Sequence, residues 1–148
     1  MVIHEMKRED CLIVLAQATI ARLACSLHDQ PYVVPVFIAR EDDYLYVFST
    51  HGKKIEWMRE NPKVCVQVDQ VSSPTEWKSV LVNGTYQELA EPQFTEERAH
   101  AREILEARHD WWLNAVAERR LNTSDVEVTP IFFRIRITEV HGIASVKD

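Results

Sequence analysis

The 148-residue chain contains only three glycines, which leaves little room for the glycine-rich motifs that many enzymes use to bind phosphate groups. A P-loop requires G-x-x-x-x-G-K-[ST] and a Rossmann dinucleotide site requires G-x-G-x-x-G, but neither pattern occurs. The G-x-S-x-G turn that presents the serine of α/β-hydrolases is missing as well. The scarcity of glycine therefore argues against three common kinds of active site.

Cysteine is equally scarce, and its three positions, Cys11, Cys25 and Cys65, are each embedded in an apolar stretch. Because they are odd in number and far apart, we interpret them as reduced core residues rather than as disulfide partners. No C-x-x-C is present, and the six histidines show no H-E-x-x-H spacing. We therefore expect no metal site.

The chain has no run of about 18 apolar residues, the length that a membrane-spanning helix needs. Its N-terminal segment carries acidic residues where a secretory signal would be basic. The formal net charge of −6 argues against nucleic acid or an anionic membrane as the main partner, because both attract basic proteins. We expect a cytoplasmic protein that binds a small ligand.

The pattern of apolar residues predicts one domain over residues 1–148, because 46% of the chain is hydrophobic and can form a core. Helical spacing predicts helices at about residues 7–17 and 95–118, and a short helix that ends before Asn61-Pro62. Six β-branched or alternating segments predict strands, at residues 18–27, 31–40, 44–50, 63–70, 79–89 and 131–145. The expected fold is α+β and mainly β, an antiparallel barrel or sheet with flanking helices.

The spacing within these segments also predicts which side chains form the core. Val64, Val66 and Val68 alternate with polar neighbours and should share one face of a strand. The apolar stripe of the late helix contains Ala101, Ile104, Leu105, Trp111 or Trp112, Ala115 and Val116. The two tryptophans are adjacent, so only one of them should face the core.

The stretch YVFSTHGKKIEWMRENP, residues 46–62, joins a predicted strand to the short helix. Lys53 and Lys54 stand where this helix begins, although the helix dipole makes positive side chains mildly unfavourable there. A bound phosphate would explain them, because free N–H groups, the dipole and two ammonium groups all stabilise a dianion. Thr50 could cap the helix or bind the anion, and His51 could help to hold it. Solvated surface charges are the alternative interpretation.

Pro35 interrupts the run YVVPVFI, which otherwise has the pattern of a central strand. Proline cannot donate a hydrogen bond to a neighbouring strand, so it is confined to edges, bulges and strand starts. Such an interruption leaves nearby backbone groups free to bind the edge of a planar ligand. An ordinary edge strand explains the proline equally well.

The order of these elements resembles the FMN-binding split-barrel family of pyridoxamine 5'-phosphate oxidase and its relatives. The shared features are a helix, a strand, a hairpin with proline in its first member, the motif ST.GKK....RENPKV, and a strand with W.S....G. The most specific part is the spacing from Lys54 to Pro62, followed at once by KVCVQV. The resemblance covers about residues 5–90 well and the remainder by topology.

This resemblance implies a six-stranded antiparallel split β-barrel and a homodimer with FMN at the subunit interface. The strand Val33–Ile38 would lie along the isoalloxazine ring, so its central residues are candidate cofactor contacts: Val34, Pro35 and Val36. Hydroxyl or amide groups of Ser49 and Thr50 would hydrogen-bond the phosphate, and Lys53 and Lys54 would neutralise it.

Two further candidates follow from the same resemblance. Ser79 stands where relatives place a polar side chain that reaches the flavin. Trp77 could cover part of the pocket, although a core or dimer-interface tryptophan is equally consistent with the sequence.

The implied activity is that of an FMN-dependent oxidoreductase acting on a small molecule, with a nicotinamide cofactor as a possible electron donor. No acid/base pair has a telling spacing, so no catalytic side chain is assigned; the flavin itself carries the redox chemistry. The C-terminal arginine and histidine motif of pyridoxamine phosphate oxidases is not matched by IRITEVHGIASVKD, although Arg134 and Arg136 could bind some anion. Flavin binding without turnover, and haem or a deazaflavin in place of FMN, remain alternatives.

Overall fold

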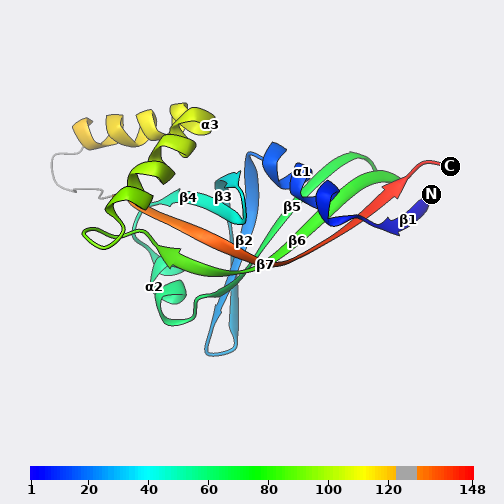
Figure 1. Ribbon diagram of the computed structural model, residues 1–148, viewed down its shortest axis with the longest axis horizontal. Coiled ribbons are helices and arrows are strands. Elements are labelled where there is room, and N and C mark those ends of the chain that lie inside the picture. The colour runs from blue at the N-terminus through cyan, green and yellow to red at the C-terminus, as the bar shows by residue number, and fades with distance from the viewer. Residues whose placement is uncertain (123–129) are drawn as a thin grey trace.

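A computed structural model describes the backbone of residues 1–122 and 130–148, and the side chains of residues 1–109 and 130–148. Strands dominate the described part of the chain, and three helices lie around them (Figure 1). In chain order the elements are β1 Val2–Glu5, α1 Arg8–Gln17, β2 Ile20–Leu27, β3 Gln30–Glu41, β4 Tyr44–Ser49, α2 Lys53–Glu60, β5 Lys63–Ser73, β6 Glu76–Glu88, α3 Thr95–Asn122 and β7 Ile131–Val146.

Six of the strands form a closed antiparallel ring. Their order is β7-β4-β3-β2-β5-β6, and β6 pairs again with β7 to complete the barrel. The α+β, mainly β fold class is thereby confirmed. The short strand β1 was not predicted; it pairs with the second half of β7, from Val2 opposite Val146 to Glu5 opposite Ile143.

The barrel interior is filled by alternate residues of the strands. Val64, Val66 and Val68 are all nearly inaccessible to solvent, as the alternation in β5 predicts. In β7 both Phe132 and Phe133 are buried, because they face two different apolar clusters. Phe133 points into the barrel, whereas Phe132 packs on the other face of the sheet, beneath α3.

The helix α3 covers this second cluster with the apolar stripe that the sequence predicts. Ala101 and Leu105 are buried in it, and Ile104 is partly buried. The helix is kinked at His109, whose φ of −134° and ψ of 41° are not helical. The predictions for Trp111, Trp112, Ala115 and Val116 lie outside the described side chains.

The helix α2 closes the opposite end of the barrel from α1 and the chain termini (Figure 1). Ile55 and Met58 are fully buried and anchor this helix to the core. Just after it, Asn61 donates from Nδ2 to the backbone oxygen of Ser26 at 3.0 Å, which ties the helix end to β2.

Within the described residues no helix is both long and apolar enough to cross a membrane. The cytoplasmic location remains a prediction.

Candidate functional site

The two lysines predicted to hold an anion begin α2, immediately after its N-cap residue Gly52. Lys54 is half-buried, and burial lowers the pKa of its ammonium group by removing water that stabilises the charge. The buried Cys25 of β2 lies close enough for the two lysines to influence its thiol; burial nevertheless raises the pKa of Cys25. An anion at this helix end would therefore meet a partly desolvated cation.

The ammonium group of Lys53 lies over two neighbouring aromatic rings. Its Nζ is 4.8 Å from the ring centroid of Tyr32 in β3 and 4.7 Å from that of Trp57 in α2. The two rings are 5.6 Å apart and inclined at 56°. We call this arrangement the Tyr32–Trp57 wedge. Lys53 is exposed to solvent there, and its ammonium group makes cation–π contacts with both rings.

Ser49, Thr50 and His51 connect β4 to α2, next to the lysines. Ser49 is buried, and its hydroxyl donates to the backbone oxygen of Thr50 at 2.9 Å. Thr50 is exposed and does not cap α2, because the N-cap is Gly52 and no side chain among the described residues caps it. The capping alternative for Thr50 is therefore wrong. His51 is exposed, with Nε2 3.6 Å from a carboxylate oxygen of Glu56.

The three candidates of β3 have different surroundings. Val36 is buried in the barrel and Val34 is partly buried against the same core. Pro35 faces outward, opposite Arg22 of β2. The pairing of β3 with β4 starts at Ile38, so upstream of it β2 is the only strand partner of β3 in the described chain. Pro35 thus lies on a strand edge, as proline requires.

Trp77 and Ser79 are not brought next to the lysines within one chain. Trp77 pairs with Val71 and Ser145, near the chain termini, whereas Thr85 of the same strand lies opposite Lys63, at the α2 end of the barrel. Thr85 follows Ser79 by six positions, which is about 20 Å of extended strand. The predicted site residues therefore form two groups at opposite ends of the barrel.

The second group belongs to a surface that sequence reasoning missed. Ser79 accepts a hydrogen bond at 3.2 Å from Nε2 of Gln67, and Gln67 lies opposite Arg22, which in turn lies opposite Pro35. These outward positions form what we call the outer sheet face: Arg22, Ala24, Val33, Pro35, Cys65, Gln67, Ser79 and Leu81. Strand alternation places each residue on this face, but only the register brings them side by side.

A pocket of about 590 Å³ opens on the same side of the sheet, towards α2. Apolar side chains such as Pro31 and Val64 line it, together with the polar side chains of Ser26, Asn83 and Thr85 and the ammonium-bearing Lys63. The thiol of Cys65 donates to Oδ1 of Asn83 at 3.1 Å in its wall. The volume is in the range of small-molecule sites.

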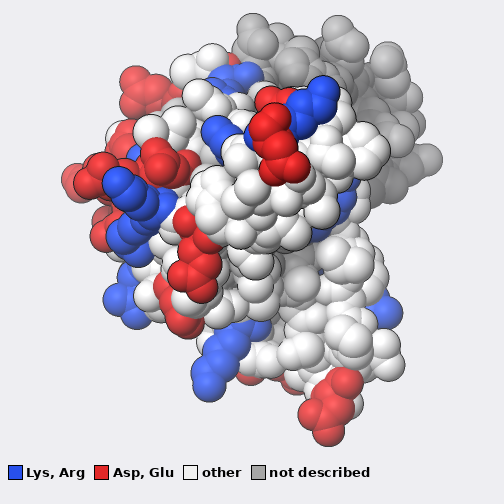
Figure 2. Space-filling model, turned by 90° about the vertical axis from the view of Figure 1, so that its right-hand side faces the viewer, with Lys and Arg blue, Asp and Glu red and all other residues white. Residues whose placement is uncertain are grey.

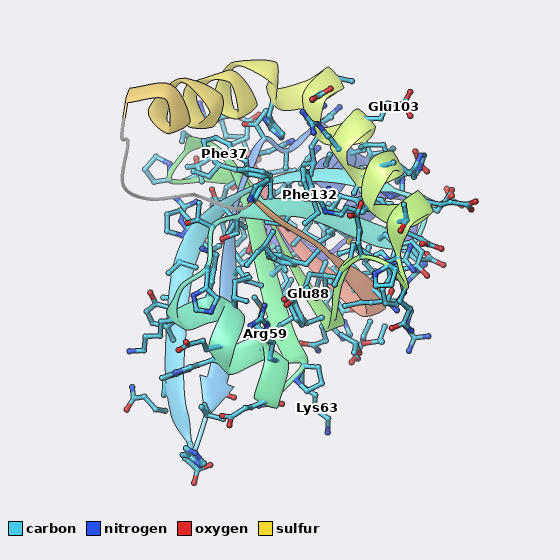
Figure 3. All side chains as sticks on the ribbon, turned by 90° about the vertical axis from the view of Figure 1, so that its left-hand side faces the viewer. Phe37, Arg59, Lys63, Glu88, Glu103 and Phe132 are labelled. Carbon is cyan, nitrogen blue, oxygen red and sulfur yellow. The ribbon has the colours of Figure 1, made fainter. Side chains whose placement is uncertain are left out.

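The C-terminal turn of α2 is held by an ion pair, which Figure 3 shows between α2 and β6. Arg59 donates from Nε and Nη2 to the two carboxylate oxygens of Glu88, at 2.7 and 3.0 Å. The hydroxyl of the buried Tyr86 donates to the same carboxylate at 2.7 Å. The bonds from Arg59 lower the pKa of Glu88, and burial raises the pKa of Tyr86.

The start of α2 offers donor groups of the kinds that bind phosphate. They are the two ammonium groups of Lys53 and Lys54, the hydroxyl of Thr50 and the free N–H groups of the first helical turn. Figure 2 looks onto the other end of the molecule, where α1 and the chain termini lie, and there Lys and Arg side chains lie beside Asp and Glu. Within the described residues no three His, Cys, Asp or Glu side chains are grouped to hold a metal ion.

Known proteins with similar sequences or structures place this chain in a family. Protein RA0666 of Rhizobium meliloti (strain 1021) is 42% identical over 150 residues, which covers 98% of this chain and 97% of that protein. The crystal structure of a FAD-binding protein from Mesorhizobium loti has 40% identity and a TM-score of 0.79, and the match covers 99% of each chain. The FAD-binding protein of Mycobacterium smegmatis, at 13% identity and a TM-score of 0.65 over 94% of this chain and 97% of that one, shares the fold.

A family model described as pyridoxamine 5'-phosphate oxidase matches residues 7–144. The matched segment contains all three helices and the six strands of the barrel, with β7 included up to Ala144. The resemblance drawn from ST.GKK....RENPKV is thus confirmed, and the chain belongs to the pyridoxamine 5'-phosphate oxidase family.

Proposed function

We propose that the protein binds a flavin nucleotide and uses it for two-electron redox chemistry on a small molecule. The observation that carries this proposal is the pair Lys53 and Lys54 at the start of α2, in a member of this family. A dianionic phosphate gains charge-assisted hydrogen bonds from both lysines and from the helix N–H groups. The FAD-binding protein of Mesorhizobium loti, at 40% identity, supports a flavin as the ligand.

FMN and FAD both carry a phosphate next to the ribityl chain, so the lysine pair suits either of them. The resemblance to split barrels favours FMN, and the Mesorhizobium loti relative favours FAD. We take the flavin mononucleotide portion, which the two share, as the part that Lys53, Lys54 and Thr50 hold. Val34 and Pro35 in β3 are the proposed contacts along the ring.

When bound, the flavin supplies hydride transfer at its N5 atom. The residues of this chain then have three tasks: to hold the phosphate, to orient the ring along β3, and to exclude water from it. A nicotinamide cofactor is the proposed electron donor. Pyridoxamine phosphate is not the proposed substrate, because the last strand, ending in IRITEVHGIASV, lacks the arginine and histidine motif of those oxidases.

We propose in addition that two copies of the chain associate through the outer sheet face. Val33 is 61% exposed and Leu81 is 41% exposed, and Ile143, which pairs with Ser79, is 46% exposed. Several exposed large apolar side chains on one sheet face are typical of an interaction surface. Association there would also give Ser79 and Trp77 of one copy a way to approach the lysine pair of the other.

The test is to purify the protein after expression without added cofactor and to record its visible absorption spectrum. A yellow protein that releases FMN or FAD on denaturation is the expected result. Anaerobic addition of NADH or NADPH should then bleach the flavin band. A haem or deazaflavin spectrum, or apoprotein that binds neither flavin at micromolar concentration, contradicts the proposal. Bound flavin that neither donor reduces favours binding without turnover.

A further inference from the structure

Resting on the proposed flavin site, we propose that the Tyr32–Trp57 wedge is a stacking site for the adenine ring of FAD, which Lys53 leaves when it binds the pyrophosphate. The wedge has two aromatic walls from different elements, Tyr32 from β3 and Trp57 from α2. Both side chains are partly exposed and partly packed against the barrel core. They therefore present ring surface to solvent from a fixed base.

The wedge lies beside the phosphate site and on the same side of the sheet. Trp57 follows Lys53 by four residues, so the two side chains are neighbours on one face of α2. The ammonium group that occupies the wedge belongs to one of the two lysines proposed to hold phosphate. A ligand that carries a ring next to its phosphates can thus use both features together.

The present contacts of Lys53 are ones that a phosphate can replace. A cation–π contact at a partly exposed site is weaker than a charge-assisted hydrogen bond from an ammonium group to a phosphate oxygen. A bound pyrophosphate therefore draws Lys53 out of the wedge. The vacated rings can then stack on a heteroaromatic base, a contact that tolerates any base because each has a π-face.

Other polar groups of α2 and β2 lie near the wedge. Glu56, the acidic residue of the first turn of α2, lies 3.6 Å from His51. Lys54 is half-buried next to Cys25, on the neighbouring strand β2. Cys25 pairs with Tyr32 across the β2–β3 ladder, so the lysines, the thiol and the wedge are contiguous.

The pocket of about 590 Å³ does not offer the same arrangement. Pro31 and Ser26 line it from the outward side of the β2–β3 hairpin, whereas Tyr32 and Trp57 pack against the core on the inward side. Asn61, which precedes β5, donates from Nδ2 to the backbone oxygen of Ser26 at 3.0 Å and to its hydroxyl at 3.3 Å. The wedge is therefore the aromatic surface that a ligand on the lysines can reach directly.

The experiment compares FAD with FMN, which lacks the adenine, on wild-type protein and the variants Trp57→Leu and Trp57→Phe. Leu keeps an apolar side chain at the core edge but has no ring, and Phe restores the ring. We expect Trp57→Leu to weaken FAD binding about 10- to 100-fold, the effect of losing one base–aromatic stack, while FMN affinity changes less than about twofold. Trp57→Phe should recover most of the FAD affinity.

FMN serves as the internal control for both folding and the proposed function. If wild-type protein binds neither flavin, the flavin site itself is wrong. If FMN binds but FAD binds no more tightly, or if Trp57→Leu weakens both flavins equally, the adenine site is wrong. A loss of NADH affinity with unchanged FAD affinity would assign the wedge to the nicotinamide donor and overturn the assignment to FAD.

A second variant tests the movement of Lys53. Lys53→Gln removes the ammonium group from the wedge without inserting a bulky group. FMN affinity should fall, because the phosphate loses a charged donor, whereas adenosine affinity should rise, because no charge has to leave the rings. Fluorescence titration with adenosine measures the second effect. Adenosine affinity that falls or stays constant contradicts the exchange.

Discussion

Arg59 and Glu88 form a bidentate ion pair that joins the last turn of α2 to the end of β6 (Figure 3). Glu88 also accepts a hydrogen bond from the hydroxyl of Tyr86, which is 7% exposed. One carboxylate therefore satisfies two donors, one charged and one buried. Together with the buried Ile55 and Met58, it fixes the helix whose first residues are Lys53 and Lys54.

Stability should depend on the charge of Glu88. Its pKa is lowered in the folded protein, chiefly by Arg59, so the charged carboxylate adds stability above its unfolded pKa of about 4.3 and loses it as pH falls through the folded value. Because the pair is partly exposed, we expect the effect to be about 1 kcal/mol. Urea unfolding at pH 7 and pH 3 should show a smaller pH dependence in Glu88→Gln than in wild type.

Glu60 provides the control for this experiment, since it is an exposed acid on the same helix. The variant Glu60→Gln should retain the pH dependence of the wild type. Equal pH dependence in Glu88→Gln and wild type would mean that the ion pair adds nothing to folding.

Gly84 should not tolerate a side chain. A Cβ atom there would lie 2.5 Å from Cγ2 of Ile135 and 2.6 Å from the backbone oxygen of Arg136, at a register shift between β6 and β7. We expect Gly84→Ala to destabilise the protein by about 1–3 kcal/mol, as overpacking does. Gly52→Ala is the control, because a Cβ there meets nothing within 4 Å. If thermal unfolding shows that Gly84→Ala and Gly52→Ala lose the same amount of stability, the close packing at Gly84 is contradicted.

His109 should contribute to stability through its buried hydrogen bond. It is 2% exposed, and its Nε2 donates to the backbone oxygen of Ile38 at 2.7 Å. His109→Phe keeps an aromatic ring beside Phe37 but removes the donor, which should cost about 1–3 kcal/mol. The ion pair of His100 with Glu41 is exposed, so His100→Phe should lower the free energy of unfolding by less than about 1 kcal/mol. Similar losses from the two variants in urea unfolding would argue against the buried bond.

The proposed association of two copies predicts a change of mass. Leu81→Arg places a charge on the outer sheet face, so it should convert a dimer into a monomer in light scattering after size exclusion. Ile13→Arg should leave the mass unchanged, because Ile13 is an exposed apolar residue of α1, away from that face. A wild-type monomer at micromolar concentration, or a Leu81→Arg dimer, would count against this surface.

The sequence predicts most of the barrel because its strands alternate strictly and its helices have clear apolar stripes. Val64, Val66 and Val68 are buried as expected, and α2 begins where the two lysines indicated. The strand β1 escapes prediction because its residues, Val2–Glu5, are all exposed and show no alternation. It forms only because β7 offers a free edge, which is a tertiary effect.

The candidate site was predictable only in part, for a geometric reason. Local motifs identified the lysines and the hydroxyl residues before them, which are close in sequence. A motif does not report distances through space, so it could not separate Ser79 from Lys53, or bring Tyr32 against Lys53. The sequence left two roles open for Thr50, and only the structure excludes capping, because the N-cap is Gly52 and Thr50 lies outside the helix.

The central claim is that the start of α2 binds the phosphate of a flavin, and a spectroscopic titration of the double variant Lys53→Ala/Lys54→Ala tests it most directly. The wild type should be yellow, and the variant should be folded but colourless. Losing two charged hydrogen bonds should weaken flavin binding by roughly 2–5 kcal/mol. The control Lys7→Ala/Lys147→Ala removes the same charge from exposed positions outside α2 and should bind flavin as the wild type does. A lysine-pair variant that stays yellow with unchanged flavin affinity would contradict the claim.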